Sequence, residues 1–200
     1  TYAYLDNSPL VDTITFKQSG TTRMVTAKAY DNLNRLTAIV SSNSSAAVLS
    51  SFRYAYNTAN QRTSVTNADS TRWNFGYDIL GQVTAGKKYW SDSTVVAGEQ
   101  FEYGYDDIGN RKTAASGGDE WGANLRYENY AANNLNQYTS RTVPASIDIL
   151  GAAHSNSTVT IWSSNATVMP VVTTRKGEYF RGEVRFTNTA GPVYLGLTNI

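Results

Sequence analysis

The chain has 200 residues, a mass of 21.9 kDa, a formal net charge of +1 and no cysteine. A chain of this length can bury a substantial core, and its balanced charge separates it from disordered chains. The cysteine count excludes disulfides, thiolate nucleophiles and cysteine-based metal sites. The 17 basic and 16 acidic residues form no basic run, which argues against nucleic acid as a partner.

The composition favours an all-β fold. Val, Ile, Thr, Tyr, Phe and Trp number 71, whereas the helix-favouring Glu, Lys and Gln number only 17. We therefore expect about fourteen antiparallel strands and no helix. No apolar run is long enough to span a membrane, and the N-terminus carries neither Met nor a signal-peptide pattern, so the chain reads as a mature or excised piece.

The first predicted elements form a hairpin. Strands are expected at residues 10–16 and 22–30, and the polar step Gln18, Ser19, Gly20 and Thr21 separates them. Residues 2–6 read as the end of a truncated repeat. The N-terminal part is therefore predicted to begin with short antiparallel strands.

A repeated unit then fills residues 29–142. Each copy is a strand that ends in Tyr, a four-residue turn, and a second strand that carries Thr. The leading tyrosines lie 26, 21, 28 and 25 residues apart, enough for two strands and two connections. The predicted turn residues are Tyr30, Asp31 and Asn34; Tyr56, Asn57 and Asn60; Tyr77, Asp78 and Gly81; Tyr105, Asp106 and Gly109; and Tyr130 and Asn134.

The residue types at these turns have a physical reason. Asp or Asn at the first turn position can accept hydrogen bonds from the backbone two residues on, and Gly or Asn at the last position tolerates a left-handed backbone. This chemistry predicts a type I turn closed by a bulge, which joins two antiparallel strands. The aromatic residues two positions before the tyrosines, Tyr54, Phe75 and Tyr103, share a sheet face with them and are interpreted as packing residues.

The pattern Tyr-Asp-x-x-Gly-(Asn/Arg/Gln), clearest at residues 77–82 and 105–111, resembles the YD repeat of Rhs proteins, toxin-complex C components and teneurins. The resemblance implies a long antiparallel β-strip that spirals into a hollow shell, which in bacterial members commonly encloses a C-terminal toxin. Complete shells are several times longer than this chain. None of its four prolines follows an Asp, so we do not expect the self-cleavage that many family members perform at an Asp-Pro segment. No toxin sequence follows the repeats in residues 143–200.

A change of character near residues 143–146 predicts two domains, a repeat sheet at 1–142 and a β-rich segment at 143–200. Four strands are expected in the second, at 158–162, 167–174, 178–186 and 193–197, which together predict a small β-sandwich-like segment. Pro170 interrupts the second of these strands and places it at an edge or at a bulge.

Catalytic chemistry has little support in the sequence. His154 is the only histidine and lies in a polar loop without a nucleophile motif. Of the acidic pairs, Asp106–Asp107 belongs to a repeat turn and Asp119–Glu120 follows two glycines, and neither matches a calcium loop. We expect no enzyme activity, no catalytic residue, no cofactor and no metal.

Exposed aromatic faces offer a different possibility, because they can stack on the apolar face of a sugar. The candidate carbohydrate-binding residues are Trp73, Tyr89, Trp90 and Trp121, and Trp90 is the one most expected to be exposed. Burial in a core is the competing interpretation.

Asn43, Asn156 and Asn165 begin glycosylation sequons, which we expect to be unmodified in a bacterial protein.

The leading hypothesis is therefore a structural segment of an Rhs-type β-shell, without catalysis of its own, that encloses or scaffolds. Because so few strands cannot close a large shell, its sheet edges are expected to pair with further chain or with identical copies. A carbohydrate-binding surface module is the alternative. Either function is expected in a secreted or cell-surface protein of a bacterium, with no nucleic acid and no membrane span.

Overall fold

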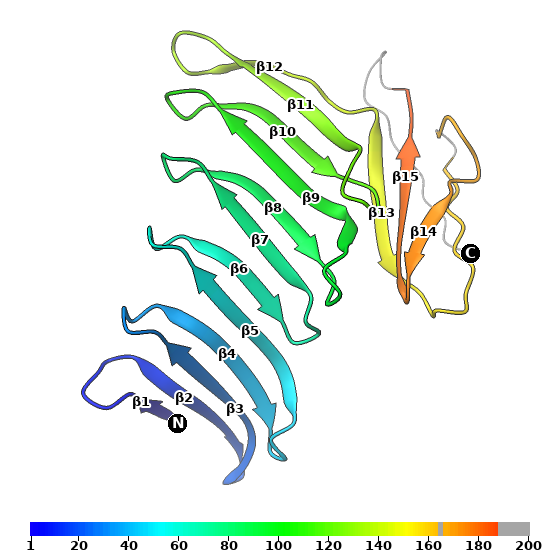
Figure 1. Ribbon diagram of the computed structural model, residues 1–200. Coiled ribbons are helices and arrows are strands. Elements are labelled where there is room, and N and C mark those ends of the chain that lie inside the picture. Colours follow the sequence, from blue (N-terminus) through cyan, green and yellow to red (C-terminus); the bar gives the residue numbers. More distant parts are fainter. Residues whose placement is uncertain (164–165, 188–200) are drawn as a thin grey trace. The chain divides into compact units, whose positions relative to one another are not determined.

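The computed structural model describes residues 1–163 and 166–187, and it contains strands and no helix within them. Strands β1 to β12 follow one another in chain order in an antiparallel sheet, so each strand pairs with its neighbours in sequence (Figure 1). This confirms the predicted meander of hairpins. The strands are β1 (Tyr2–Tyr4), β2 (Val11–Gln18), β3 (Thr21–Tyr30), β4 (Leu36–Asn43), β5 (Val48–Tyr56), β6 (Arg62–Asn67), β7 (Arg72–Tyr77), β8 (Val83–Tyr89), β9 (Val95–Tyr105), β10 (Arg111–Gly117), β11 (Leu125–Ala132) and β12 (Tyr138–Arg141).

The chain divides into two compact units, Thr1–Thr94 with β1 to β8 and Val95–Ile200 with the remaining strands. In the first unit most strand residues are half-buried on both faces, as expected of a sheet one layer thick. Such a sheet has no deep core, so its stability depends on the backbone ladder and on cross-strand side-chain pairs. The domain boundary predicted at residue 143 falls inside the second unit.

The hairpins close with one recurring five-residue turn. In the first copy the Asn34 amide donates to the Asp31 carbonyl, and the Asp31 amide donates to the Arg35 carbonyl. The fourth residue is left-handed, with φ of 59° at Asn34, 61° at Asn60, 83° at Gly81 and 91° at Gly109. A register shift beside each tyrosine marks the predicted bulge, as between Ala29 and Tyr30.

The fifth turn lies two residues later than the sequence predicted. The left-handed residue is Asn136, with φ of 60°, and Asn134 is not left-handed. The turn begins at Asn133, whose amide donates to the Gln137 carbonyl. Tyr130 therefore stands two residues before the turn's leading position, which Ala132 occupies. The prediction of Asn134 was wrong because it followed the tyrosine spacing rather than the Asn-x-x-Asn-Gln turn chemistry.

The same turn also closes the hairpins at the opposite ends of the strands, where the sequence had not indicated it. It begins at Asn43, Asn67, Trp90 and Asp119, and in each case the first residue's amide donates to the carbonyl of the fifth. The left-handed residues there are Ala46, Ser70, Ser93 and Gly122. The β2–β3 hairpin differs, since it closes through left-handed Ser19 and Gly20 as predicted.

A second sheet follows in the second unit, with strand order β13–β15–β14 (Figure 1). Its strands are β13 (Ser146–Ala152), β14 (Thr173–Lys176) and β15 (Tyr179–Arg185), all antiparallel. Strand β15 confirms the expected strand at 178–186, and β14 holds only the end of the strand expected at 167–174. The prediction of a strand at 158–162 was wrong, because this stretch forms no continuous strand and Ile161 makes an isolated bridge with Val171. The strand at 193–197 lies outside the described residues.

The three-stranded sheet has its own apolar core on one face. Ile161, Val171 and Val184 are buried there, and Ile147 and Phe180 pack against them. The loop between β13 and β14 supplies Ile161 and Val171, so this core is assembled entirely within residues 147–184. The other face of the sheet, described below, is charged.

Candidate functional site

The first turn residue acts as a cap for the turn backbone. The Asp31 Oδ1 atom accepts hydrogen bonds from the amides of Leu33 and Arg35, at 2.9 and 3.0 Å. The same two bonds are made by Asn57, Asp78, Asp106 and Asn133. The side-chain amide of Asn110 adds a bond to Asp106, and such bonds hold the pKa of Asp106 below its usual value although partial burial opposes the shift.

The tyrosines that lead the second and third turns have a role that sequence reasoning missed. The Tyr56 hydroxyl donates to the Leu36 carbonyl of the preceding hairpin at 2.8 Å, and the Tyr77 hydroxyl donates to the Arg62 carbonyl at 2.7 Å. Leu36 and Arg62 are the residues paired with the preceding tyrosine at each bulge. Because a bulge disrupts the strand ladder, a hydroxyl from the next hairpin can satisfy the carbonyl left there. Phe could supply the ring but not this bond.

The fifth turn residue links neighbouring turns. The Arg35 Nη1 atom donates to the Asn57 carbonyl at 3.2 Å and to Asn60 Oδ1 at 2.9 Å, so it reaches the next turn of the row. In the second unit Asn110 Nδ2 reaches Asn136 Oδ1 at 3.4 Å. The fifth turn residue, which the sequence analysis treated as part of the repeat motif, therefore connects neighbouring hairpins.

Cationic side chains cover the aromatic ladder. The Arg62 guanidinium lies 4.2 Å from the Tyr54 ring centroid and 5.9 Å from that of Tyr56, and Arg35 lies 4.9 Å from Tyr56. In the second unit Arg111 lies 4.8 Å from Tyr103. Cation–π contacts of this kind stabilise half-exposed rings. Of the predicted packing residues, Tyr54 and Tyr103 are thus covered by arginine, whereas Phe75 stacks on Trp73.

The two sets of turns differ at their tips. In the tyrosine-led turns the second and third residues include exposed aliphatic side chains, and at the opposite ends the same positions carry Ser, Asp, Ala, Glu and one Trp. The aliphatic tips are Leu33, Ile79, Leu80, Ile108 and Leu135, each at least 66% exposed. Because both sets share one backbone turn, turn geometry alone does not explain the difference.

The candidate sugar-binding aromatics do not share one face. Trp73 pairs with Lys88 across β7 and β8, whereas Tyr89 pairs with Arg72, so Trp73 and Tyr89 point to opposite sides of the sheet. Trp73 stacks on Phe75, with ring centroids 6.5 Å apart.

The two remaining tryptophans stand in turns at the ends opposite the tyrosine-led turns. Trp90 is half-buried and begins its turn, so its exposure is less than the sequence suggested. Trp121 is 78% exposed at the tip of the turn that begins at Asp119. Trp121 is therefore the most accessible of the four candidate aromatics.

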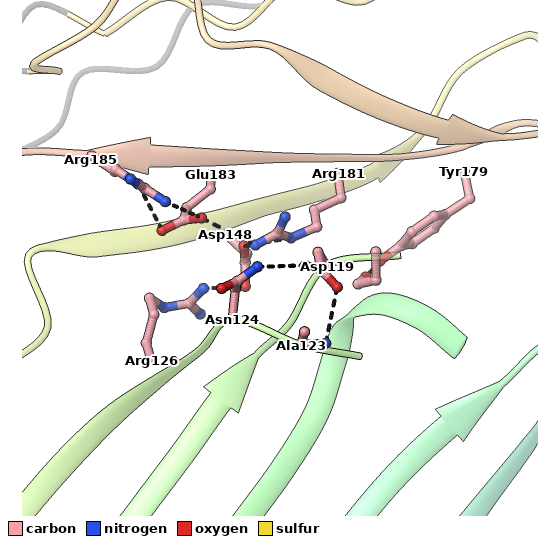
Figure 2. Close-up of polar contacts among 10 residues, drawn as sticks. Asp119, Ala123, Asn124, Arg126, Asp148, Tyr179, Arg181, Glu183 and Arg185 are labelled. Atoms are coloured by element: carbon pink, nitrogen blue, oxygen red, sulfur yellow. Dashed lines mark hydrogen bonds and ion pairs between the residues drawn. The ribbon is translucent and has the colours of Figure 1, made fainter. Parts of the chain in front are cut away.

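A charged cluster lies where the three-stranded sheet meets β9 to β11 within the second unit (Figure 2). Asp148 of β13 accepts bonds from two arginines, Arg126 Nη1 of β11 at 2.6 Å and Arg181 Nε of β15 at 2.8 Å. The side chains of Asp148, Arg181 and Arg126 are only 6%, 8% and 14% exposed. Sequence analysis did not single out these residues, because they are far apart in the chain.

The cluster continues along β15. The Glu183 Oε2 atom lies 3.5 Å from Arg181 Nη2, and the Glu183 Oε1 atom lies 3.2 Å from Arg185 Nε. These cations and hydrogen bonds hold the pKa of Glu183 below its usual value, although burial opposes this shift (Figure 2). The Tyr179 hydroxyl donates to the Ala97 carbonyl at 2.5 Å, and burial raises the pKa of Tyr179. The Arg126–Asp148 ion pair and the Tyr179–Ala97 hydrogen bond therefore join the three-stranded sheet to β11 and β9.

Within residues 1–163 and 166–187, no group of three or more His, Cys, Asp or Glu side chains could hold a metal ion, and no helix could cross a membrane. The His154 Nδ1 atom accepts the Asn156 amide at 3.3 Å in the loop that follows β13.

Hairpins joined in chain order by capped turns and by tyrosine hydroxyls define a repeat protein of the antiparallel β-strip class. Residues 56–94 match the family described as RHS Repeat. Residues 56–94 therefore carry the RHS repeat, as the tyrosine-led turns of this stretch predicted.

One solved structure shows the same fold, and a second is less similar. The crystal structure of TcdB2-TccC3-Cdc42 matches 94% of this chain and 10% of that chain at 13% identity, with a TM-score of 0.52. The crystal structure of TcdB2-TccC3-TEV matches 85% and 9% at 12% identity, with a TM-score of 0.37. The chain thus spans about a tenth of the length of these matched chains. No curated protein matches its sequence.

Proposed function

We propose that the chain forms a segment of an Rhs-type β-sheet shell, called the wall below, and that its role is to enclose or to scaffold. It performs no catalysis of its own. The observation that carries this proposal is the bonding between successive hairpins of the first unit. Tyr56 and Tyr77 donate to the preceding hairpin, and Arg35 reaches the following turn. Asp31 caps its own turn and pairs with Arg35, which leaves little of its bonding capacity for a substrate. These contacts maintain a sheet rather than a reaction centre.

The outermost strands of the sheet support its extension by further strands of the same kind. Strands β1 and β12 stand at the two ends of the strand order, and an outermost strand presents backbone groups that a further strand can pair with. The aliphatic tips of the tyrosine-led turns add apolar surface along the ends of the hairpins. The proposed partners are further chain of the same protein or identical copies.

The proposed setting is outside the cell, at the surface of a bacterium or in secreted form, with a cargo enclosed by the wall. The support is the family and the fold. A hollow shell needs many more hairpins than this chain has, which agrees with a match to a tenth of a longer chain. Enclosure therefore requires the partners named above.

Solution scattering together with hydrogen exchange tests the proposal. We expect the purified chain to form concentration-dependent, ordered assemblies in which the amides of β1 and β12 gain protection as the concentration rises. A strictly monomeric protein whose terminal strands are already well protected would contradict the wall proposal. Sedimentation velocity across a hundredfold range of concentration supplies an independent measure of mass.

Carbohydrate binding is the second candidate, and the exposure of Trp121 is the observation that favours it. A glycan array distinguishes the two functions. Binding at millimolar concentration that is lost in Trp121→Ala and retained in Trp90→Ala would support a sugar site at this turn. A negative array, with the assembly behaviour above intact, leaves only the structural function.

A further inference from the structure

An arginine joins the first two tyrosine-led turns of the first unit. The Arg35 Nε atom lies 2.7 Å from Asp31 Oδ2, and the Arg35 Nη1 atom donates to the Asn57 carbonyl at 3.2 Å. The Arg35 guanidinium also lies 4.9 Å from the centroid of the Tyr56 ring. These turns therefore hold a guanidinium with a carboxylate of one turn and with a carbonyl and a tyrosine ring of the next.

The step from the second turn to the third has no arginine at this position. Gln61 stands where the first turn has Arg35, and its Oε1 atom accepts a bond from Asn57 Nδ2 of its own turn at 2.6 Å. Tyr77 leads the third turn as Tyr56 leads the second. Within the part of the chain that the structure describes, the Tyr77 ring makes no cation–π contact.

A hollow of about 550 Å³ lies at this second step. Residues of the second and third turns and of their strands line it, among them the amides Asn57 and Gln61 and the aromatic residues Phe75 and Tyr77. Asp78 is the one charged residue among the described residues of this lining. Aromatic rings beside a single carboxylate make a cation the complementary group.

The Asp78 carboxylate uses one of its oxygens for its own turn. The Oδ1 atom accepts the amides of Leu80 and Gln82, each at 2.9 Å. In the first turn the other carboxylate oxygen, Asp31 Oδ2, pairs with Arg35, whereas the third turn has Gln82 at the position of Arg35. Among the described residues, no group donates to Asp78 Oδ2. This oxygen can therefore accept a bond from another molecule.

From this comparison we infer that the hollow binds an arginine side chain of a partner polypeptide. The guanidinium of the partner pairs with Asp78 and lies against the Tyr77 ring. The first turn gives the precedent, since Arg35 pairs with a carboxylate and lies against a tyrosine ring there. An arginine fits better than a lysine because its planar group stacks on rings and donates two parallel bonds to a carboxylate. The inference goes beyond the proposed wall function and holds whether or not copies of the chain associate.

Saturation-transfer difference nuclear magnetic resonance on the full chain tests this site, because it detects weak binding to a monomer and to an assembly alike. The probe is the blocked peptide acetyl-Gly-Arg-Gly-amide, and matched peptides carry Lys or Gln in place of the arginine. We expect saturable transfer to the arginine side-chain protons at millimolar concentration. The Lys peptide should bind more weakly, and the Gln peptide should receive no transfer.

Asp78→Asn is the decisive variant. An asparagine caps the same turn through its Oδ1 atom at Asn57 and at Asn133, so the variant keeps the turn and removes the charge. We expect the affinity for the Arg peptide to fall by about tenfold or more, because a hydrogen bond to a charged group is lost. Asp107→Asn is the matched control, since it removes the same charge from an exposed position of another turn, and we expect its affinity to be unchanged.

A second variant fills the hollow from within the chain. Gln61→Arg places a guanidinium at the position that Arg35 holds in the first turn. We expect this guanidinium to compete with the peptide, so the affinity for the Arg peptide should fall at least as far as in Asp78→Asn. A circular dichroism spectrum equal to that of the parent shows that each variant is folded.

Several outcomes would overturn the inference. The Arg peptide receives no transfer, or the Arg and Gln peptides receive it equally. Equal affinities for the Arg and Lys peptides would remove the assignment of a guanidinium. An Asp78→Asn variant that binds as tightly as the parent would remove the carboxylate from the site. Equal losses in Asp78→Asn and Asp107→Asn would show attraction to net charge rather than binding in this hollow.

Discussion

Replacement of Tyr56 by Phe tests whether the turn tyrosines hold neighbouring hairpins together through their hydroxyls. The Tyr56 hydroxyl donates to the Leu36 carbonyl at 2.8 Å in a partly buried position. The Phe ring can keep the packing and the contact with Arg35, whose guanidinium lies 4.9 Å from the ring centroid. The substitution therefore removes one hydrogen bond and little else.

The expected loss follows from that single bond. A neutral intramolecular hydrogen bond contributes a net of about 0.5–1.5 kcal/mol, and a partly buried carbonyl left without a partner moves the cost toward the upper end. With a urea slope of about 2 kcal/mol/M, a loss of about 1 kcal/mol lowers the unfolding midpoint by about 0.5 M. Tyr56→Phe should therefore be measurably less stable than the parent chain.

Urea unfolding followed by far-ultraviolet circular dichroism measures this midpoint. Tyr2→Phe is the matched control, since Tyr2 is 61% exposed in the first strand, and its expected effect lies within about 0.5 kcal/mol of zero. If Tyr56→Phe and Tyr2→Phe shift the midpoint equally, the hydroxyl does not join the hairpins. An unchanged slope is also required, because a changed slope indicates a different unfolded or native state.

Three further substitutions test the turns. Gly81→Ala places a Cβ on a backbone with φ of 83° and should lower the free energy of unfolding by about 1–2 kcal/mol, whereas a neutral result in urea unfolding would show that the turn relaxes. Asp106 has a folded pKa below its unfolded value, so its stabilisation is present above about pH 3.9 and is lost as the pH falls through the folded pKa. Asp106→Asn should therefore destabilise at pH 7 but converge with the parent as the pH falls below the folded pKa of Asp106, and parallel pH curves would refute this account. Leu80→Ser should weaken self-association in sedimentation without a change in the unfolding midpoint, and unaltered association would remove this tip from the proposed assembly surface.

Local turn chemistry was readable in the sequence. Asp31, Asn57, Asp78 and Asp106 cap turns within four residues of themselves, so no distant segment is needed to place them. The fifth turn shows the limit of a spacing argument, since Asn133 and Gln137 repeat the side-chain bond of Asn57 and Gln61. An Asn followed four residues later by a Gln therefore indicates the position of this turn better than the tyrosine spacing does.

The turns at the opposite ends of the strands were not readable. Ala46 and Ser70 adopt left-handed backbones that their own chemistry disfavours, with φ of 61° and 64°. Asn43 nevertheless caps the first of these turns with the same two bonds that Asp31 makes. The cap at the first turn position, rather than the residue at the left-handed position, was therefore the signal that sequence reasoning missed there.

The hairpin repeat was determined by the sequence alone, because its residues meet partners a few positions away. Strand β13 and the ion pairs of Asp148 were decided by the tertiary structure, since Asp148 meets Arg126 22 residues upstream and Arg181 33 residues downstream. Nothing in the residues around Asp148 shows that two arginines will neutralise it. The pairing of β13 with β15 brings Arg181 to Asp148, and burial against β11 makes Arg126 its second partner.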